Sequence, residues 1–375
     1  MTAGLLTVTT EPASKCATLR SDWLDLEHRA QPTVFLSWQW LGHWLQVYKP
    51  DALVLRVMEG ERLVGLGLVV ESEERRHGLL KSRCLRLHQT GHKLLDQIWI
   101  EYNGFLAERG KEDAVAKASL EHLCRTMPEW DEFILGAIDA DEADHYAKIT
   151  GLYKHLRWEA PCFGVDLDSL RQSGGTYLDT LSRNTRHQIN RAHRIYSERG
   201  EVSLVRPGSV EEALAVFDAI GPRHLERWGN GPDQSGFANP DFVRFHRELI
   251  REQWAEGGVD LISVMAGDEE IAFLYNLLHN KVVYFYLGGM AVETDNRLKP
   301  GLVGHALCIE DYRNQGFDYY DFMGGDERYK SNLGHFHRNL VQIALQRPRF
   351  KLKLEDVARR ARNRWIGEAS ANNER

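Results

Sequence analysis

The chain has 375 residues, 43% of them hydrophobic and 27% charged, and its formal net charge is −7. This is ordinary globular composition, and at roughly 150 residues per domain the length favours two domains over one. Because a protein whose main task is to grip nucleic acid usually has a basic excess, the acidic balance argues against DNA binding.

The cysteine pattern and the N-terminus exclude further classes. The five cysteines are far apart and form no CxxC pair, so neither a disulfide framework nor a metal site is expected. The first residues lack the basic start and apolar core of a signal peptide. No stretch approaches the roughly 20 apolar residues that span a bilayer. We therefore predict a cytoplasmic protein with no transmembrane segment.

Periodicity and turn residues predict the same order of elements in both halves of the chain. In the first half these are helices over 21–29 and about 40–45, a hairpin of strands 53–58 and 62–70, apolar runs at 83–87 and 97–100, a helix over 112–124 and a strand over 132–138. In the second half they are strands over 260–265, 270–278 and 282–287, a helix over 302–314 and a strand over 319–322.

The two hairpins are alike in sequence. Val57-Met58-Glu59-Gly60-Glu61 is echoed by Val264-Met265-Ala266-Gly267-Asp268, which predicts a duplicated α/β unit.

The boundary between the units is predicted near residues 160–176, where Pro161 and the polar residues 171–175 indicate a flexible segment. The predicted domains are 1–165, 166–350 and a charged helix or tail over 351–375. A solvated surface helix and a docking arm for an acidic partner are both open for that tail.

A basic helix is predicted to begin after Ser182, which can cap it, and to end at Gly200. One face of this helix is lined by Arg183, Arg186, Asn190 and Arg194. An arginine fork can hold a carboxylate or a phosphate, but a solvated helix face explains the same pattern.

The segment 297–305 follows a strand and opens a helix. Pro300 suits the first helical turn, and Gly301 and Gly304 let a ligand approach the backbone closely. Free amides at a helix N-terminus, beside Arg297 and Lys299, would bind a pyrophosphate. The residues predicted to form this pyrophosphate-binding site are Arg297, Lys299, Gly301, Val303 and Gly304.

A third segment follows the strand at 319–322. Two glycines end this strand and deliver Asp326, Glu327 and Lys330 to one loop. Loops after strand ends commonly carry chemistry, and a turn with solvated charges is the alternative.

Together these segments resemble the GNAT-superfamily group that contains CelD-like acetyltransferases of exopolysaccharide gene clusters and, more distantly, Fem-type peptidyltransferases. Residues 181–192 are similar to its "L-S-x-x-T-R-x-x-[IL]-x-R-A" segment, 223–228 to its "H-x-x-R-W" segment and 321–330 to its "D-F-x-x-G-D-E-x-Y-K" ending. Residues 35–44 look like its N-terminal aromatic segment, and the resemblance spans most of residues 33–345.

The resemblance implies an α/β (α+β) fold of tandem GNAT-like domains, each a mixed, mostly antiparallel sheet flanked by helices. The active cleft would lie between or beside them. Acetyl-coenzyme A or another acyl-coenzyme A would be the co-substrate, held at the segment 297–305 because GNAT folds bind coenzyme A at that position. That segment departs from the usual "[RQ]-x-x-G-x-[GA]" spacing.

The resemblance also implies roles for single residues. Lys330 takes the place of a functionally important lysine of Fem-type enzymes. Asp96 falls where relatives often carry "S-D-Y", although Gln97 stands here instead of the tyrosine. The predicted acceptor contacts are Arg186, Asp96, Trp228 and Tyr286.

The leading hypothesis is acyl transfer to an amine or hydroxyl of a small-molecule, sugar or peptide acceptor, in a setting such as polysaccharide or cell-envelope biosynthesis. Asp326 or Glu327 would be the base, Lys330 would neutralise developing negative charge, and Arg186 would hold an anionic part of the acceptor. Two alternatives stay open: an aminoacyl-tRNA-dependent amino-acid transferase of Fem type, and a catalytically silent GNAT-like scaffold.

Overall fold

The computed structural model describes residues 5–76 and 80–357. The elements of the first unit are β1 (Leu6–Pro12), η1 (Ala13–Lys15), α1 (Leu19–Ala30), η2 (Val34–Leu36), α2 (Trp38–Tyr48), β2 (Ala52–Glu59), β3 (Arg62–Arg76), β4 (Leu80–Leu87), η3 (Leu95–Ile98), β5 (Leu106–Ala107), α3 (Glu112–Thr126), β6 (Glu132–Asp139), α4 (Ala140–Thr150) and β7 (Tyr153–Asp166).

The second unit follows with α5 (Leu167–Ser173), α6 (Tyr177–Thr180), α7 (Arg183–Ser197), β8 (Val202–Val205), α8 (Val210–Trp228), η4 (Gly236–Ala238), α9 (Pro240–Gln253), β9 (Val259–Ala266), β10 (Glu269–His279), β11 (Val282–Met290), α10 (Pro300–Gln315), β12 (Tyr319–Gly324), α11 (Arg328–Leu333) and β13 (His335–Gln346).

The two units repeat one element order, strand, two helices, three strands, helix, strand, helix, strand. The predicted hairpins are β2–β3 and β9–β10, and both turn glycines, Gly60 and Gly267, have φ near +60°, a conformation that costs glycine little. In each unit one strand pair is parallel, β4 with β6 and β11 with β12, while the other pairs are antiparallel.

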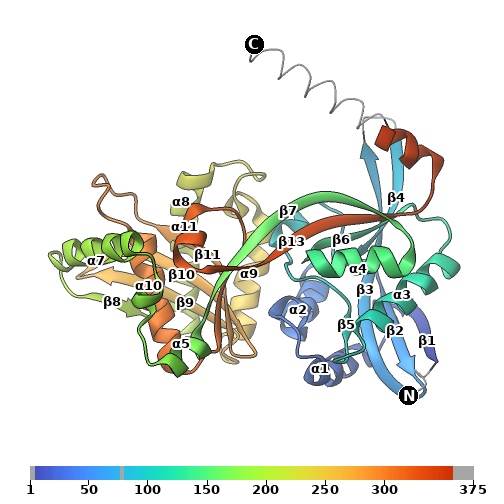
Figure 1. Ribbon diagram of the computed structural model, residues 1–375, viewed down its shortest axis with the longest axis horizontal. Coiled ribbons are helices and arrows are strands. Elements are labelled where there is room, and N and C mark those ends of the chain that lie inside the picture. Colours follow the sequence, from blue (N-terminus) through green and yellow to red (C-terminus); the bar gives the residue numbers. More distant parts are fainter. Residues whose placement is uncertain (1–4, 77–79, 358–375) are drawn as a thin grey trace, which may run out of the picture.

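The last strand of each unit is exchanged with the other. The sheet order is β1-β2-β3-β4-β6-β13-β7-β12-β11-β10-β9-β8, so β13 pairs with β6 of the first unit and β7 pairs with β12 of the second. The long strands β7 and β13 run side by side and join the two lobes (Figure 1). The units are therefore held together by main-chain hydrogen bonds at the middle of one continuous sheet.

Two sequence-based expectations need correction. The segment around Pro161 is not a flexible linker, because Pro161 lies within β7 opposite Asn339 of β13, and residues 167–173 form α5. The apolar run at 97–100 gives no strand but ends the 3-10 turn η3, where the Gln97 amide donates to the Pro232 carbonyl of the second unit at 2.6 Å.

The exact domain limits stay a prediction. Residues 350–357 are helical, and the rest of the predicted tail lies outside the described residues.

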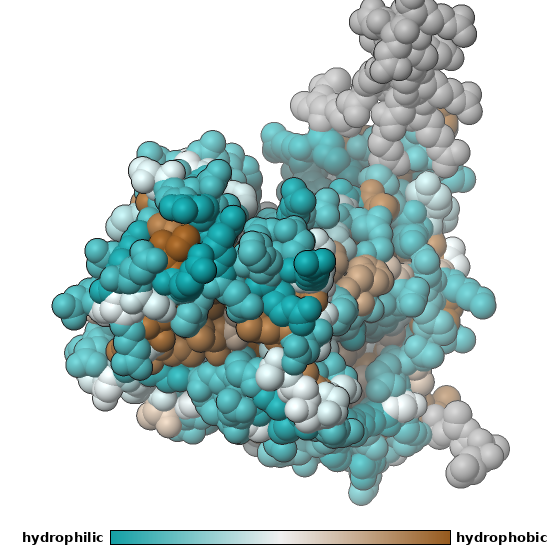
Figure 2. Space-filling model, turned by 60° about the vertical axis from the view of Figure 1, so that its left-hand side comes forward, coloured by the Kyte–Doolittle hydropathy of each residue, from teal (hydrophilic) through white to brown (hydrophobic). Residues whose placement is uncertain are grey.

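A core shared by both units fixes their relative placement. The equivalent helices α2 and α9 pack against each other, with the Trp40 and Phe245 rings 5.2 Å apart and both side chains buried. Trp40 and Trp44 of α2 belong to this core, and the half-buried Trp38 packs against it. The outer surface seen in Figure 2 is mostly hydrophilic, with hydrophobic side chains gathered in a recessed band.

Candidate functional site

A cavity of about 1280 Å³ lies between the two units. The first unit lines it with the loop before Tyr102 and with parts of β6 and β7, and the second unit lines it with α8, β11, the start of α10 and the loop between β12 and α11. The predicted residues Asp96, Trp228, Tyr286, Lys299, Gly301, Asp326, Glu327 and Lys330 all line this cavity.

One wall is a fork between the parallel strands β11 and β12. They pair only from Val282–Tyr319 to Tyr284–Asp321, and both continue beyond that point along the cavity. A register shift in the β10–β11 ladder leaves Tyr286 without an opposite residue. Beyond the fork, main-chain groups of β11 on the β12 side have no strand neighbour among the described residues, so a ligand can bond to them.

The fork opens onto the N-terminus of α10. Lys299 is the N-cap residue without a side-chain cap, Pro300 has no N–H, and the Val303 amide donates to the Lys299 carbonyl at 3.1 Å. The amides of Gly301 and Leu302 are left at the positive end of the helix dipole, beside the cavity.

The equivalent helix of the first unit cannot serve in the same way. Its first turn carries Glu112 and Asp113, and Glu112 accepts the Gly110 amide at 3.0 Å. These carboxylates would repel an anion, so within the described residues the anion site at this helix position belongs to the second unit.

Three predicted donor residues do not line the cavity. Val303 is buried in the core, and a Cβ on Gly304 would lie 3.1 Å from the Val264 side chain of the sheet. Arg297 forms a fork with Asp295, with Nη2 at 2.7 Å from the carboxylate. Gly304 therefore permits close packing of α10 on the sheet, and donor roles for these residues stay predictions.

The loop after β12 brings Lys330 and Glu327 together. Lys330 is buried, and its Nζ donates to the Gly324 carbonyl at 2.7 Å and lies 3.3 Å from Glu327 Oε2. Gly325 has φ of 149°, and a Cβ there would come within 2.6 Å of Lys330 Nζ. A side chain at Gly325 would therefore displace the ammonium. Asp326 is exposed at the cavity edge.

Glu101 joins this loop from the first unit, and the sequence reasoning missed it. Its carboxylate accepts the Gly324 amide at 2.8 Å, so Glu101 and Lys330 are both anchored on Gly324. Burial raises the pKa of Glu101 to about 7, and the nearby Lys330 opposes that rise. A carboxyl group with such a pKa can accept a proton near neutral pH.

The backbone around Glu101 is strained. Trp99 and Tyr102 both have positive φ, 43° and 50°, which is costly for aromatic residues and is characteristic of functional sites. The Tyr102 hydroxyl donates to Asp321 at 2.7 Å and ties this segment to β12. One feature of the sequence could have identified Glu101. In the family's "S-D-Y" segment a tyrosine directly follows the acidic residue, and Tyr102 follows Glu101 in this way, whereas Gln97 follows Asp96.

The predicted acceptor residues differ in how their polar groups are used. Asp96 accepts the Thr90 and Gly91 amides at 2.7 and 2.8 Å, so its carboxylate organises the loop. The Tyr286 hydroxyl donates to the Ile98 carbonyl, which leaves the ring as a cavity wall. Trp228 is 43% exposed at the cavity.

Arg186 lies outside the cavity lining. It sits on α7, where it pairs with Asp179 at 3.2 Å. The cap predicted for this helix is confirmed, since Ser182 Oγ accepts the Thr185 amide at 3.1 Å.

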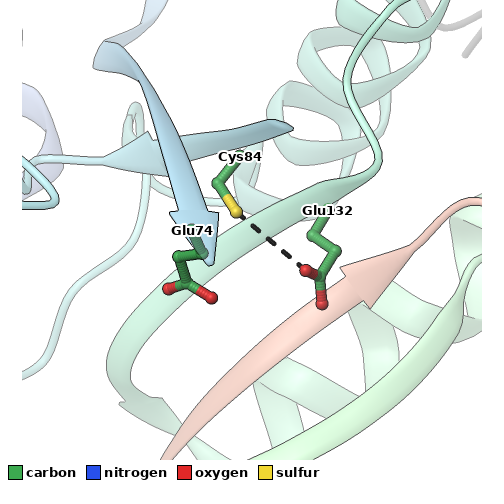
Figure 3. A group of neighbouring side chains, drawn as sticks. All are labelled: Glu74, Cys84 and Glu132. Atoms are coloured by element: carbon green, nitrogen blue, oxygen red, sulfur yellow. Dashed lines mark hydrogen bonds between the residues drawn. The ribbon is translucent and has the colours of Figure 1, made fainter. Parts of the chain in front are cut away.

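One group of side chains has metal-ligand character. Glu74, Cys84 and Glu132 point toward one another, with ligand atoms within 4.8 Å (Figure 3). Arginines already occupy the carboxylates: Arg157 bonds to Glu74 at 2.9 Å, and Arg76 bonds to Glu132 at 2.6 Å. Burial works against ionisation of Glu132, but hydrogen bonds from Ser82, Gln346 and Arg76 outweigh it and lower its pKa to about 2. The group is thus an ion-pair network.

Part of the second unit is similar in sequence to a known protein family. Residues 183–331 match the family model described as "Acetyltransferase (GNAT) domain". No curated protein matches the sequence. 

Solved structures that are similar over nearly the whole chain include the following three. FemX matches with TM-score 0.57 and 11% identity over 90% of this chain and 98% of FemX. L-PGS from Bacillus licheniformis matches with TM-score 0.53 and 11% identity over 90% and 96% of the two chains. The C-terminal domain of a putative lysylphosphatidylglycerol synthetase from Agrobacterium fabrum matches with TM-score 0.52 and 10% identity over 90% and 94%.

At these identities the likeness concerns the fold alone. It agrees with the repeated element order, and the predicted fold class of tandem GNAT-like units is confirmed. No helix in the described ranges is long and apolar enough to cross a membrane. The chain is a mixed α/β protein of two GNAT-like units, and residues 183–331 of its second unit match the acetyltransferase (GNAT) domain model.

Proposed function

We propose that the protein transfers an acyl group from acyl-coenzyme A to an amine or hydroxyl acceptor. The observation that carries this proposal is the fork of β11 and β12, which leads to the uncapped amides of Gly301 and Leu302. An extended thioester arm fits a fork with free strand groups, and a pyrophosphate fits a helix N-terminus. Lys299 adds a positive charge at the same place.

The chemistry follows from the groups gathered around Gly324 at the end of β12. The acceptor nitrogen or oxygen bonds to the acyl carbon, the carbon–sulfur bond breaks with its electron pair going to the departing coenzyme A thiolate, and the acceptor proton passes to a carboxylate. We assign that carboxylate to Glu101, because it lines the cavity and its pKa of about 7 suits proton transfer. Glu327 is engaged by Lys330 and Asp326 is exposed, so both are weaker candidates.

Lys330 is the second contributor. Its buried ammonium compensates the negative charge of Glu101 and Glu327, and amides of β11 beyond the fork are placed to bind the oxyanion of the tetrahedral intermediate. A small-molecule, sugar or peptide acceptor, a role in polysaccharide or cell-envelope biosynthesis, and a cytoplasmic location stay part of this proposal.

One observation favours a second candidate, transfer from aminoacyl-tRNA. Helix α7 has four arginines and no acidic residue, and Arg183 and Arg194 are exposed on it. Such a face suits a phosphate backbone. Mass spectrometry of the purified protein separates the candidates. Co-purified coenzyme A thioester would support the first candidate and co-purified tRNA the second. If neither ligand co-purifies, a catalytically silent scaffold is favoured.

Replacing Gly301 by tryptophan is expected to weaken acetyl-coenzyme A binding at least tenfold, because the indole would fill the space beside the free amides. Gly301→Ala is the matched control: its φ is not left-handed, and its Cβ would meet only the flexible Met290 side chain at 3.3 Å. Calorimetry gives both dissociation constants. Equal binding by Gly301→Trp and wild type would remove this donor site.

A further inference from the structure

The first unit has a strand fork of its own on the opposite side of the cavity. β4 and β6 pair in parallel at Cys84–Glu132, Leu85–Phe133 and Arg86–Ile134, and β6 then continues to Asp139 while β4 ends. The residues beside this second fork, Arg86, Gln89, Gly136 and Ala137, line the same cavity that the donor fork lines. None of the first residues of α3 lines the cavity, and its first turn is acidic, so a different ligand must be sought for this fork.

Arg86 is a buried cation held in a fixed orientation. Only 6% of the residue is exposed, its Nε donates to Ser72 Oγ at 2.9 Å and its Nη2 donates to Glu74. No hydrogen bond from Nη1 is found within residues 5–76 and 80–357. A guanidinium with two nitrogens fixed and one left over at a cavity can bind an anion in one defined direction.

Gln89 supplies an unpartnered polar group at the same fork. The residue is 9% exposed, and its Oε1 is buried without a hydrogen-bond partner in the described part of the chain. It packs across Gly136, where a Cβ would come within 2.6 Å of Oε1. Buried polar groups normally find a partner, and a ligand that donates a hydrogen bond would supply it.

We propose that this second fork binds the acceptor through a carboxylate that contacts Arg86 and an adjacent N–H or O–H that donates to Gln89. The inference rests on the proposed acyl transfer, whose acceptor it defines as a carboxylate-bearing amine or alcohol. A singly charged group is favoured over a phosphate, because Glu74 already shares the guanidinium. Lys93 lies at the same rim but pairs with Asp233 at 2.6 Å.

The probe is N-acetylglycine, which carries a carboxylate beside an amide N–H, observed by saturation-transfer NMR on the full chain. We expect a signal from N-acetylglycine at least threefold stronger than from its neutral amide, and its loss in Gln89→Leu. This variant removes an unsatisfied group at nearly constant volume, so it should fold at least as well as wild type. Arg86→Met should lose the signal too, and Lys117→Ala, at an exposed position of α3, is the control.

The outcomes separate the two proposals. Absence of an N-acetylglycine signal in wild type, its persistence in Gln89→Leu, or stronger displacement by inorganic phosphate than by acetate would each overturn the carboxylate site. Calorimetry with acetyl-coenzyme A is run on the same proteins, and we expect both variants to bind it as wild type does. Failure of wild type to bind acetyl-coenzyme A would defeat the proposed function and leave the fragment result standing.

Discussion

Glu101→Gln is expected to lower kcat by about 10²–10⁴-fold, the usual contribution of a positioned proton acceptor. The amide keeps the shape of the side chain but cannot take the acceptor proton. Release of coenzyme A from acetyl-coenzyme A, measured with a saturating acceptor, gives the value. The affinity for acetyl-coenzyme A should not change, because Glu101 is bonded to Gly324 and the predicted pyrophosphate site is at the amides of Gly301 and Leu302.

The pH dependence adds a second signature to this variant. In wild type kcat/KM should rise with an apparent pKa of about 7, because burial holds Glu101 protonated below that value. The rise should be absent from the residual activity of Glu101→Gln. A variant that keeps both its rate and the rising limb would show that the base lies elsewhere.

Stability should vary with pH in the opposite sense. The folded pKa of Glu101 lies above the ordinary value of 4.5, so between about 4.5 and 7 the native state binds more protons than the unfolded one. The contribution of Glu101 to the free energy of unfolding should thus fall as pH rises through that window. Glu101→Gln should lack this component in denaturant titrations.

Lys330→Met is expected to lower kcat about 10²-fold or more, through loss of charge stabilisation in the transition state. Lys330 is buried and bonded to Gly324 rather than solvated, so the variant should also lose about 1–3 kcal/mol of stability. The rate must therefore be measured on protein shown to be folded by circular dichroism.

A matched pair of variants separates charge from structure. Lys330 lowers the pKa of Glu101 and Glu327 raises it, although burial is the larger influence. The rising limb of the pH profile should move to higher pH in Lys330→Met and to lower pH in Glu327→Gln. Shifts in the same direction in both variants, or none, would contradict a direct electrostatic role for Lys330.

The sequence alone determined the features that depend on near neighbours along the chain. The hairpin turns at Gly60 and Gly267 need a left-handed residue, and Ser182 caps a helix from three residues away. The loop from Gly324 to Lys330 is equally local, because its two glycines and its lysine meet within six residues. These features depend on residues close together in the sequence, so they form largely independently of the tertiary contacts around them.

The tertiary structure decided which residues come together at the cavity. Glu101 meets Gly324 across 223 positions of sequence, so no local pattern could pair them. Gly301 and Gly304 both looked open to a ligand, yet packing turns Gly304 toward Val264 and leaves Gly301 at the cavity. Periodicity fixes the angle between two helix positions but not which side meets the sheet.

The exchange of β7 and β13 was equally beyond the sequence. A strand alternation tells which side chains are buried, not which strand lies alongside, since either unit could in principle have kept its own last strand. The pairing is decided by long-range main-chain hydrogen bonds and by the core that both units share. That exchange places the two forks on one cavity, where a donor and an acceptor can meet.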